Sequence, residues 1–164
     1  MKTTFALALT LAAASLAVAQ PVNGNLENTF RALKQEKTKV YDSLDRLSSY
    51  HPMLMSYESH ATEWTTVRDG LNRSGAMLRA LEQQRGAMSP AQAVRFDSLK
   101  AQLAEVAADT QVMITRLREN QRYIAMPAYL TAVKQLTAKA SGARTQAIEI
   151  LALSTGQGGS QTGD

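Results

Sequence analysis

Apolar residues recur along this chain at alternating steps of four and three residues. The first series contains Leu26, Phe30, Leu33, Val40, Leu44 and Leu47, with Lys37 in one of its positions. Similar series cover residues 57–85, 90–125 and 127–153. Because this spacing places side chains on one face of an α-helix, the pattern predicts an all-α fold. Lys37 and Thr110 stand within the apolar seams, where they either set the register of the packed helices or mark where a seam reaches solvent.

A helix stop and a helix start lie next to each other at the middle of the chain. Gly86 predicts the end of one helix in the left-handed conformation, because glycine has no Cβ to clash there. Ser89 predicts the start of the next helix, since Ser89 and Gln92 have the spacing of a capping box. Pro90 would occupy the first helical position, where no N–H is needed. The sequence therefore predicts a central helical hairpin.

Two prolines interrupt the outer parts of the pattern. Pro52 leaves room for a loop, after which Ser56 can cap the next helix. Pro127 has no Gly, Asn, Ser or Asp directly beside it, so we expect a kink there rather than the start of a separate helix. In a hairpin closed at the central turn, both prolines would lie roughly 55 Å from the turn, for a helical rise of ~1.5 Å per residue.

Two architectures fit these elements. The first is an antiparallel bundle of three to four long helices built on the central hairpin. Its support is the wide apolar face between residues 96 and 124 and the small residues that dominate 138–143, which allow additional helices to approach. The alternative is one long, kinked two-arm coiled-coil hairpin, in which both arms continue through their prolines. We favour the bundle.

Residues 1–19 have the composition of a secretory signal peptide. Lys2 supplies a positive charge, an apolar run extends from Phe5 to Leu16, and Ala17-Val18-Ala19 has the small residues of a cleavage site. We expect cleavage after Ala19, a periplasmic or secreted location, and no membrane span in the mature chain. The predicted divisions are a signal peptide at 1–19, a linker at 20–25, a helical bundle domain at 26–153 and a disordered tail at 154–164.

Composition excludes several classes of protein. The chain has no cysteine, which excludes disulfides, thiolate metal sites and attachment of lipid or haem through cysteine. The formal net charge of +4 falls to about +3 without Lys2, and acids and bases are interspersed, which is not typical of nucleic-acid binding. Lys134, Lys139 and Arg144 form a basic strip opposed only by Glu149. This strip is either a solvated helix face or a contact for an anionic envelope surface.

Candidate catalytic or metal-binding groups are sparse. His60, Glu63 and Trp64 share one helix face, but a stable metal site needs three or four ligands. No histidine has a glutamate three residues before it, as di-iron bundles require. Motifs for nucleophilic catalysis or phosphate binding are also missing from the sequence. We therefore expect a protein that is not an enzyme and that carries no cofactor.

Aromatic residues and methionines gather around the two prolines. Such residues are common in protein-binding hot spots, and they are also common at the ends of helical bundles. The candidate partner-binding residues are Tyr50, His51, Met53, Met55, Tyr57, Trp64, Tyr123, Met126 and Tyr129.

These observations favour an exported helical protein that acts as an interaction partner or structural component of the cell envelope. We expect a protein partner, and the heptad spacing also allows a homo-oligomer. One alternative is a periplasmic holdase chaperone. A second is a minor pilin-like subunit of a secretion apparatus, which is similar to the exported three-helix minor pilins only in its expected architecture and its signal peptide.

Overall fold

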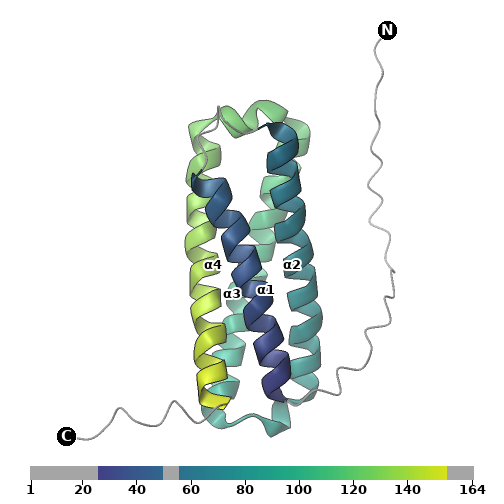
Figure 1. Ribbon diagram of the computed structural model, residues 1–164, viewed down its shortest axis with the longest axis vertical. Coiled ribbons are helices and arrows are strands. Elements are labelled where there is room, and N and C mark those ends of the chain that lie inside the picture. Colours follow the sequence, from purple (N-terminus) through teal and green to yellow (C-terminus); the bar gives the residue numbers. More distant parts are fainter. Residues whose placement is uncertain (1–25, 50–55, 155–164) are drawn as a thin grey trace, which may run out of the picture.

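The computed structural model describes residues 26–49 and 56–154 as an all-helical structure (Figure 1). Four long α-helices and two short 3-10 helices make up these ranges, and no strand occurs in them. The elements are α1 (Leu26–Ser49), α2 (Tyr57–Gln83), η1 (Arg85–Ala87), α3 (Pro90–Glu119), η2 (Gln121–Ala125) and α4 (Pro127–Ser154). The prediction of an all-α bundle built on a central hairpin is confirmed.

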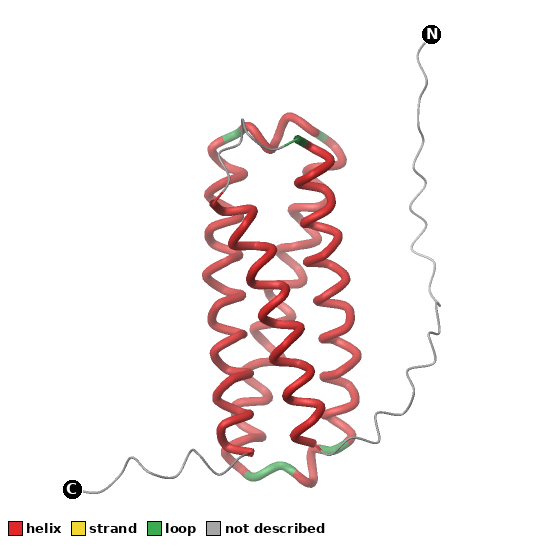
Figure 2. The backbone as a smooth tube through the Cα atoms, viewed as in Figure 1, coloured by secondary structure: helices red, strands yellow, loops and turns green. Residues whose placement is uncertain are grey.

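The four helices form an antiparallel bundle in which each helix reverses the direction of the one before it (Figure 2). α1 packs along both α2 and α4, and α4 also packs along α3. The alternative two-arm hairpin is wrong, because α1 folds back along α2 and α4 folds back along α3. α2 and α3 contact each other much less than the other neighbouring pairs do. The bundle therefore has three closely packed sides and one more open side.

The core consists of the apolar seams that the sequence pattern predicts. Phe30 of α1 and Phe96 of α3 meet edge to face, with ring centroids 6.5 Å apart. On α4 the core positions at Ala140, Ala143 and Ala147 are small, which lets α1 approach closely. Thr137 lies on α4 and donates a hydrogen bond from Oγ1 to the Leu44 carbonyl of α1 at 3.2 Å. A side chain this short reaches a neighbouring backbone only when the two helices are in close contact.

The central turn contains the predicted capping box. The Ser89 Oγ accepts from the Gln92 N–H at 3.3 Å, and the Gln92 Oε1 accepts from the Ser89 N–H at 2.8 Å. Pro90 begins α3. The left-handed conformation expected at Gly86 is wrong, since Gly86 lies within η1 and its φ is outside the left-handed region. The 3-10 hydrogen bond from the Gln84 N–H to the Leu81 carbonyl tightens the end of α2, so no left-handed residue is required.

The second proline starts a helix instead of kinking one, so the expectation of a kink at Pro127 is wrong. α3 ends at Glu119, and Asn120 leaves the helical region with φ −145° and ψ 97°. The Asn120 side chain then accepts from the Arg122 N–H at 3.0 Å and caps η2. After η2, Pro127 occupies the first position of α4, where it needs no N–H. The prediction considered only the residues directly beside Pro127. The capping residue is Asn120, at the start of η2.

Two glycines of α2 differ in their surroundings. A Cβ built on Gly70 would lie 2.6 Å from Cγ2 of Val40 on α1. A Cβ on Gly75 would meet only the guanidinium of Arg79, at 3.8 Å. Gly70 is therefore required for the close approach of α1 and α2, whereas Gly75 is not.

Candidate functional site

A buried cluster of aromatic side chains lies at the end of the bundle where α2 begins and α3 ends. His60 and Trp64 come from α2, Tyr123 comes from η2 and Tyr129 comes from α4. The Tyr129 ring centroid lies 5.4 Å from that of His60 and 5.7 Å from that of Tyr123, in edge-to-face geometry. Arg116 of α3 donates to the Tyr123 hydroxyl at 3.1 Å. The cluster thus joins three helices and the η2 turn at one level.

The Tyr129 hydroxyl is the centre of this cluster. It accepts a hydrogen bond from Nε1–H of Trp64 at 3.1 Å and lies 2.8 Å from Nδ1 of His60. Because the indole N–H can only donate, the Tyr129 O–H is left to donate to Nδ1 of His60. This assigns the His60 proton to Nε2, which is buried and has no hydrogen-bond partner among the described residues.

Burial keeps both titratable groups of the cluster uncharged. Burial raises the pKa of Tyr129 to about 12, although the hydrogen bond from Trp64 opposes this effect. Burial also lowers the pKa of His60 below its ordinary value. A neutral phenol that donates to a neutral imidazole is consistent with the 2.8 Å contact between the Tyr129 hydroxyl and Nδ1 of His60. The cluster therefore joins α2 to α4 by hydrogen bonds at this end of the bundle, and it leaves Nε2 of His60 without a partner among the described residues.

The structure brings together three of the candidate partner-binding residues, but it places them in the core. The exposed fractions are 2% for Trp64, 7% for Tyr123 and 1% for Tyr129. Tyr57 is half-buried, and Met126 is 41% exposed. His60, which shares its helix face with Glu63 and Trp64, is buried with the aromatic rings. The remaining candidates, Tyr50, His51, Met53 and Met55, lie outside the described residues, as does Pro52.

A groove lies on the more open side of the bundle, beside the aromatic cluster. It has a volume of about 220 Å³ and is formed by α2 and α3; we call it the α2–α3 groove. The residues that line it are Tyr57, Ala61, Trp64, Thr65 and Arg68 of α2 and Ile114, Leu117 and Arg118 of α3. Most of these side chains are apolar, and two arginines complete the lining. Trp64 therefore has two roles, because it donates to Tyr129 inside the bundle and also lines the groove.

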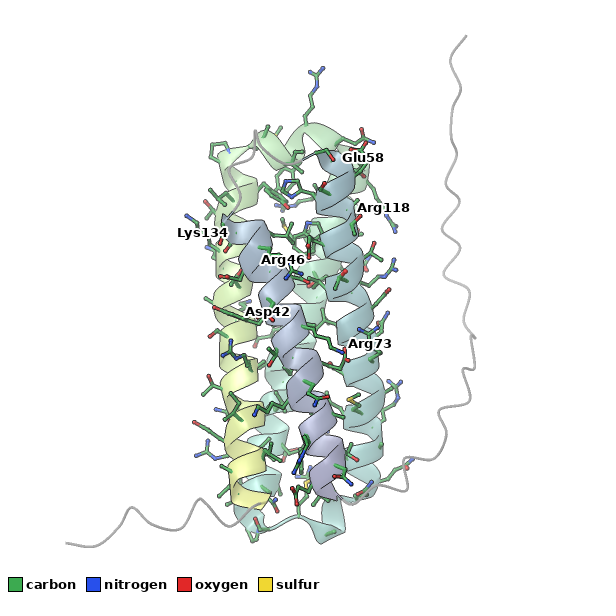
Figure 3. The ribbon with its side chains drawn as sticks, viewed as in Figure 1. Asp42, Arg46, Glu58, Arg73, Arg118 and Lys134 are labelled. Carbon is green, nitrogen blue, oxygen red and sulfur yellow. The ribbon has the colours of Figure 1, made fainter. Side chains whose placement is uncertain are left out.

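The charged groups of the groove belong to Arg68 and Arg118. Arg68 forms an ion pair with its sequence neighbour Asp69 at 2.9 Å, and both side chains are partly exposed. Arg118 is exposed and forms no ion pair among the described residues. Figure 3 shows Arg118 and Glu58 toward the same end of the bundle. The α2–α3 groove thus combines an apolar lining with positive charge from both of its helices.

A lysine side chain is buried in the middle of α1. Lys37 is 2% exposed, and its Nζ has no hydrogen-bond partner within the described part of the chain. Burial lowers the pKa of Lys37 to about 7, although the negative charge of Glu36 opposes this effect. Thr110 of α3 is likewise 2% exposed. The two polar seam positions are therefore inside the bundle and do not mark where the seams reach solvent.

The predicted basic strip on α4 is largely neutralised. Lys139 forms ion pairs with Asp109 at 2.7 Å and Glu105 at 3.6 Å, both on α3. Arg144 lies over the ring of Tyr41 on α1, 4.8 Å from its centroid. The Glu149 carboxylate pairs with Arg95 of α3, not with the strip. Lys134 is the third residue of the strip. It is exposed on the outer side of α4 and forms no ion pair or ring contact with the described residues (Figure 3).

The acidic and histidine side chains of the described residues do not form a metal site. Glu63, which shares a helix face with His60, accepts two hydrogen bonds from the Arg46 guanidinium, each 2.9 Å long. Within residues 26–49 and 56–154, no three His, Asp or Glu side chains gather in a way that could hold a metal ion.

None of the helices in these two ranges combines the length and the apolar character needed to cross a membrane.

Comparison of the chain with protein-family models, with curated proteins and with solved structures finds no match in any of the three. The fold alone does not assign a function either, since helical bundles perform many unrelated roles. The α2–α3 groove and the sequence of the N-terminus are the features that bear on function.

Proposed function

We propose that this protein is an exported, non-catalytic component of the cell envelope that acts by binding another protein. The observation that carries the proposal is the α2–α3 groove, an apolar recess on the least tightly packed side of the bundle. The signal-peptide pattern in residues 1–19 supports export to the periplasm or the exterior. The candidate chemical groups support a non-catalytic role, because His60 and Trp64 are each hydrogen-bonded to the Tyr129 hydroxyl inside the bundle.

The surface of the bundle favours this role over that of a holdase chaperone. A holdase needs broad apolar surfaces for unfolded chains, whereas the described helices bury their apolar seams against one another. Large apolar side chains that remain exposed in the described part are Val94, Val112, Met126 and Ile148. They come from scattered positions on α3, η2–α4 and α4. A small apolar recess for one anchoring group, such as the α2–α3 groove, fits a defined partner better than it fits many clients. A minor pilin-like subunit would also bind a protein partner. The identity of the partner therefore distinguishes that alternative from other envelope proteins.

Photo-crosslinking in the source cells tests the proposal. A photoreactive phenylalanine analogue replaces Ala61, which lines the groove, or Ala138, which is exposed on α4 and serves as the control. We expect one discrete crosslinked protein from position 61 and none from position 138, together with a mature N-terminus at Gln20. The captured protein is then purified and titrated against the mature chain, so that binding is measured with defined components. Equal crosslinking from both positions, or none from position 61, contradicts the proposal.

A further inference from the structure

We infer that the α2–α3 groove binds a segment of a partner protein in which a large apolar side chain is flanked by carboxylates. This inference rests on the proposed function and adds the chemistry of the partner. Two independent features of the groove support it, namely its size and its charge.

The size of the groove matches an anchoring side chain better than a small molecule. Pockets for cofactors and drug-sized ligands commonly have volumes of about 300–1,000 Å³. The α2–α3 groove has about 220 Å³ and is lined by apolar groups from both helices, including Trp64, Ile114 and Leu117. One large side chain from a partner can fill a recess of this kind, as anchor residues do at protein interfaces. The apolar lining thus specifies the centre of the bound segment.

The charge of the groove specifies the residues on either side of that anchor. Arg68 contributes a guanidinium from α2 and Arg118 contributes one from α3. The pair between Arg68 and Asp69 joins two partly exposed groups that are adjacent in sequence, and such surface pairs contribute little free energy. Arg118 has no ion pair within the described residues. Both guanidiniums are therefore available to carboxylates, which they can bind with two parallel hydrogen bonds.

Two wider depressions on the described surface lack this combination. One, of about 560 Å³, lies beside Pro90 and contains Arg95, whose charge is already paired with Glu149. The other, of about 570 Å³, lies along α1 and is lined by polar residues, Lys34 among them, apart from Leu151. Its Arg31 and Lys39 pair with Glu27 and Glu36, respectively. Among the described residues, the α2–α3 groove differs from these two depressions in combining an apolar lining with an arginine, Arg118, that forms no ion pair. A further recess, of about 230 Å³ between α3 and α4, also has apolar lining, but its cations are engaged: Arg116 donates to the Tyr123 hydroxyl and Lys139 pairs with Asp109.

Selection from a random peptide library displayed on phage tests the inference with the intact mature chain. Peptides that bind wild-type protein are expected to contain a large apolar residue flanked by Asp or Glu. A synthetic peptide with the selected sequence is then titrated while the emission of Trp64, the single tryptophan of the chain, is followed. Arg118→Glu is expected to weaken its binding by about tenfold or more, since like charges would face each other. Arg79→Glu is the matched control, because Arg79 is an exposed arginine of α2 outside the groove.

The variant with both arginines reversed in charge should gain a new binding preference, which a misfolded protein could not show. Selection on the Arg68→Glu/Arg118→Glu protein should recover peptides with Lys or Arg beside the apolar residue. Peptides without acidic enrichment, equal binding to Arg118→Glu and wild type, or no recovered binder would overturn the inference. Two further results would also overturn it: self-association through the groove in light scattering, or displacement of the peptide by decanoate at equal potency. If position 61 captures a partner whose binding is insensitive to Arg118→Glu, the inference fails while the proposed function stands.

Discussion

The buried ammonium of Lys37 gives the sharpest test of the energetics of the bundle. Replacing Lys37 with Met keeps a long flexible side chain in the core but removes the charge. A buried charge without a hydrogen-bonded partner destabilises the folded state, so the variant should be more stable than wild type at neutral pH. The difference should depend on pH in a way that identifies Lys37 as its source.

The magnitude follows from the pKa of Lys37, which is about 7 in the folded chain against an ordinary value of 10.5. Between these two pH values the unfolded chain binds more protons than the folded chain, so wild-type stability rises with pH there. At pH 7 the cost of burying the charge is about 4 kcal/mol, and it falls by about 1.4 kcal/mol per pH unit to about 1 kcal/mol near pH 10. Lys37→Met removes this cost, so its advantage over wild type shrinks as pH rises.

The assay is urea unfolding of the mature chain followed by far-ultraviolet circular dichroism, at pH values from about 6 to about 10. Taking the difference between variant and wild type cancels groups that titrate in both proteins. Lys134→Met is the control, because Lys134 is exposed on α4 and its removal should leave the free energy of unfolding nearly unchanged. An advantage of Lys37→Met that is the same at both ends of the pH range, or that grows with pH, would refute the reasoning.

Three further predictions concern thermal and urea unfolding of the mature chain. Gly70→Ala should destabilise the bundle by about 1–3 kcal/mol, because its Cβ would clash with α1. Gly75→Ala should stabilise it by about 1 kcal/mol through helix propensity. Changes of the same sign in the two free energies of unfolding would contradict the packing described for α2. Tyr129→Phe should cost about 1–3 kcal/mol and alter the emission of Trp64, since the indole N–H loses its acceptor; unchanged emission would count against the network. Ser89→Ala should cost about 1 kcal/mol by removing the capping box, and no measurable change would show that the cap contributes nothing.

The helices and the central turn were predictable because their signals are local. The four-three spacing identified the buried apolar positions of α1, and the Ser89–Gln92 capping box identified the start of α3. Ser56 was likewise predicted as a cap and accepts from the Ser59 N–H at 3.2 Å. Each of these features depends on residues within one turn of a helix or on a repeat along one helix. Such patterns are visible in a single sequence.

The wrong predictions at Gly86 and Pro127 concern local structure, whereas the other parts that sequence did not reveal depend on contacts between distant segments. The pattern could not decide whether Lys37 was buried, because that depends on which helices cover α1. His60 stands four residues before Trp64 on the same buried face, a signal that pointed to the core, but its bond to Tyr129 joins α2 to α4. The α2–α3 groove depends on the spacing of two helices, and no motif specifies that spacing. The aromatic residues were correctly expected near one end of the bundle, but their exposure could not be predicted.

We propose that the α2–α3 groove is the surface through which the protein acts. The most direct measurement compares how the partner captured from position 61 binds to wild type, to Ala61→Phe and to Ala138→Phe, in titrations with purified components. Ala61→Phe fills the groove without adding charge, whereas Ala138→Phe adds the same ring on the exposed side of α4. The account predicts that Ala61→Phe weakens binding by about tenfold or more, while Ala138→Phe binds as wild type does. Binding to Ala61→Phe as tight as to wild type would contradict it.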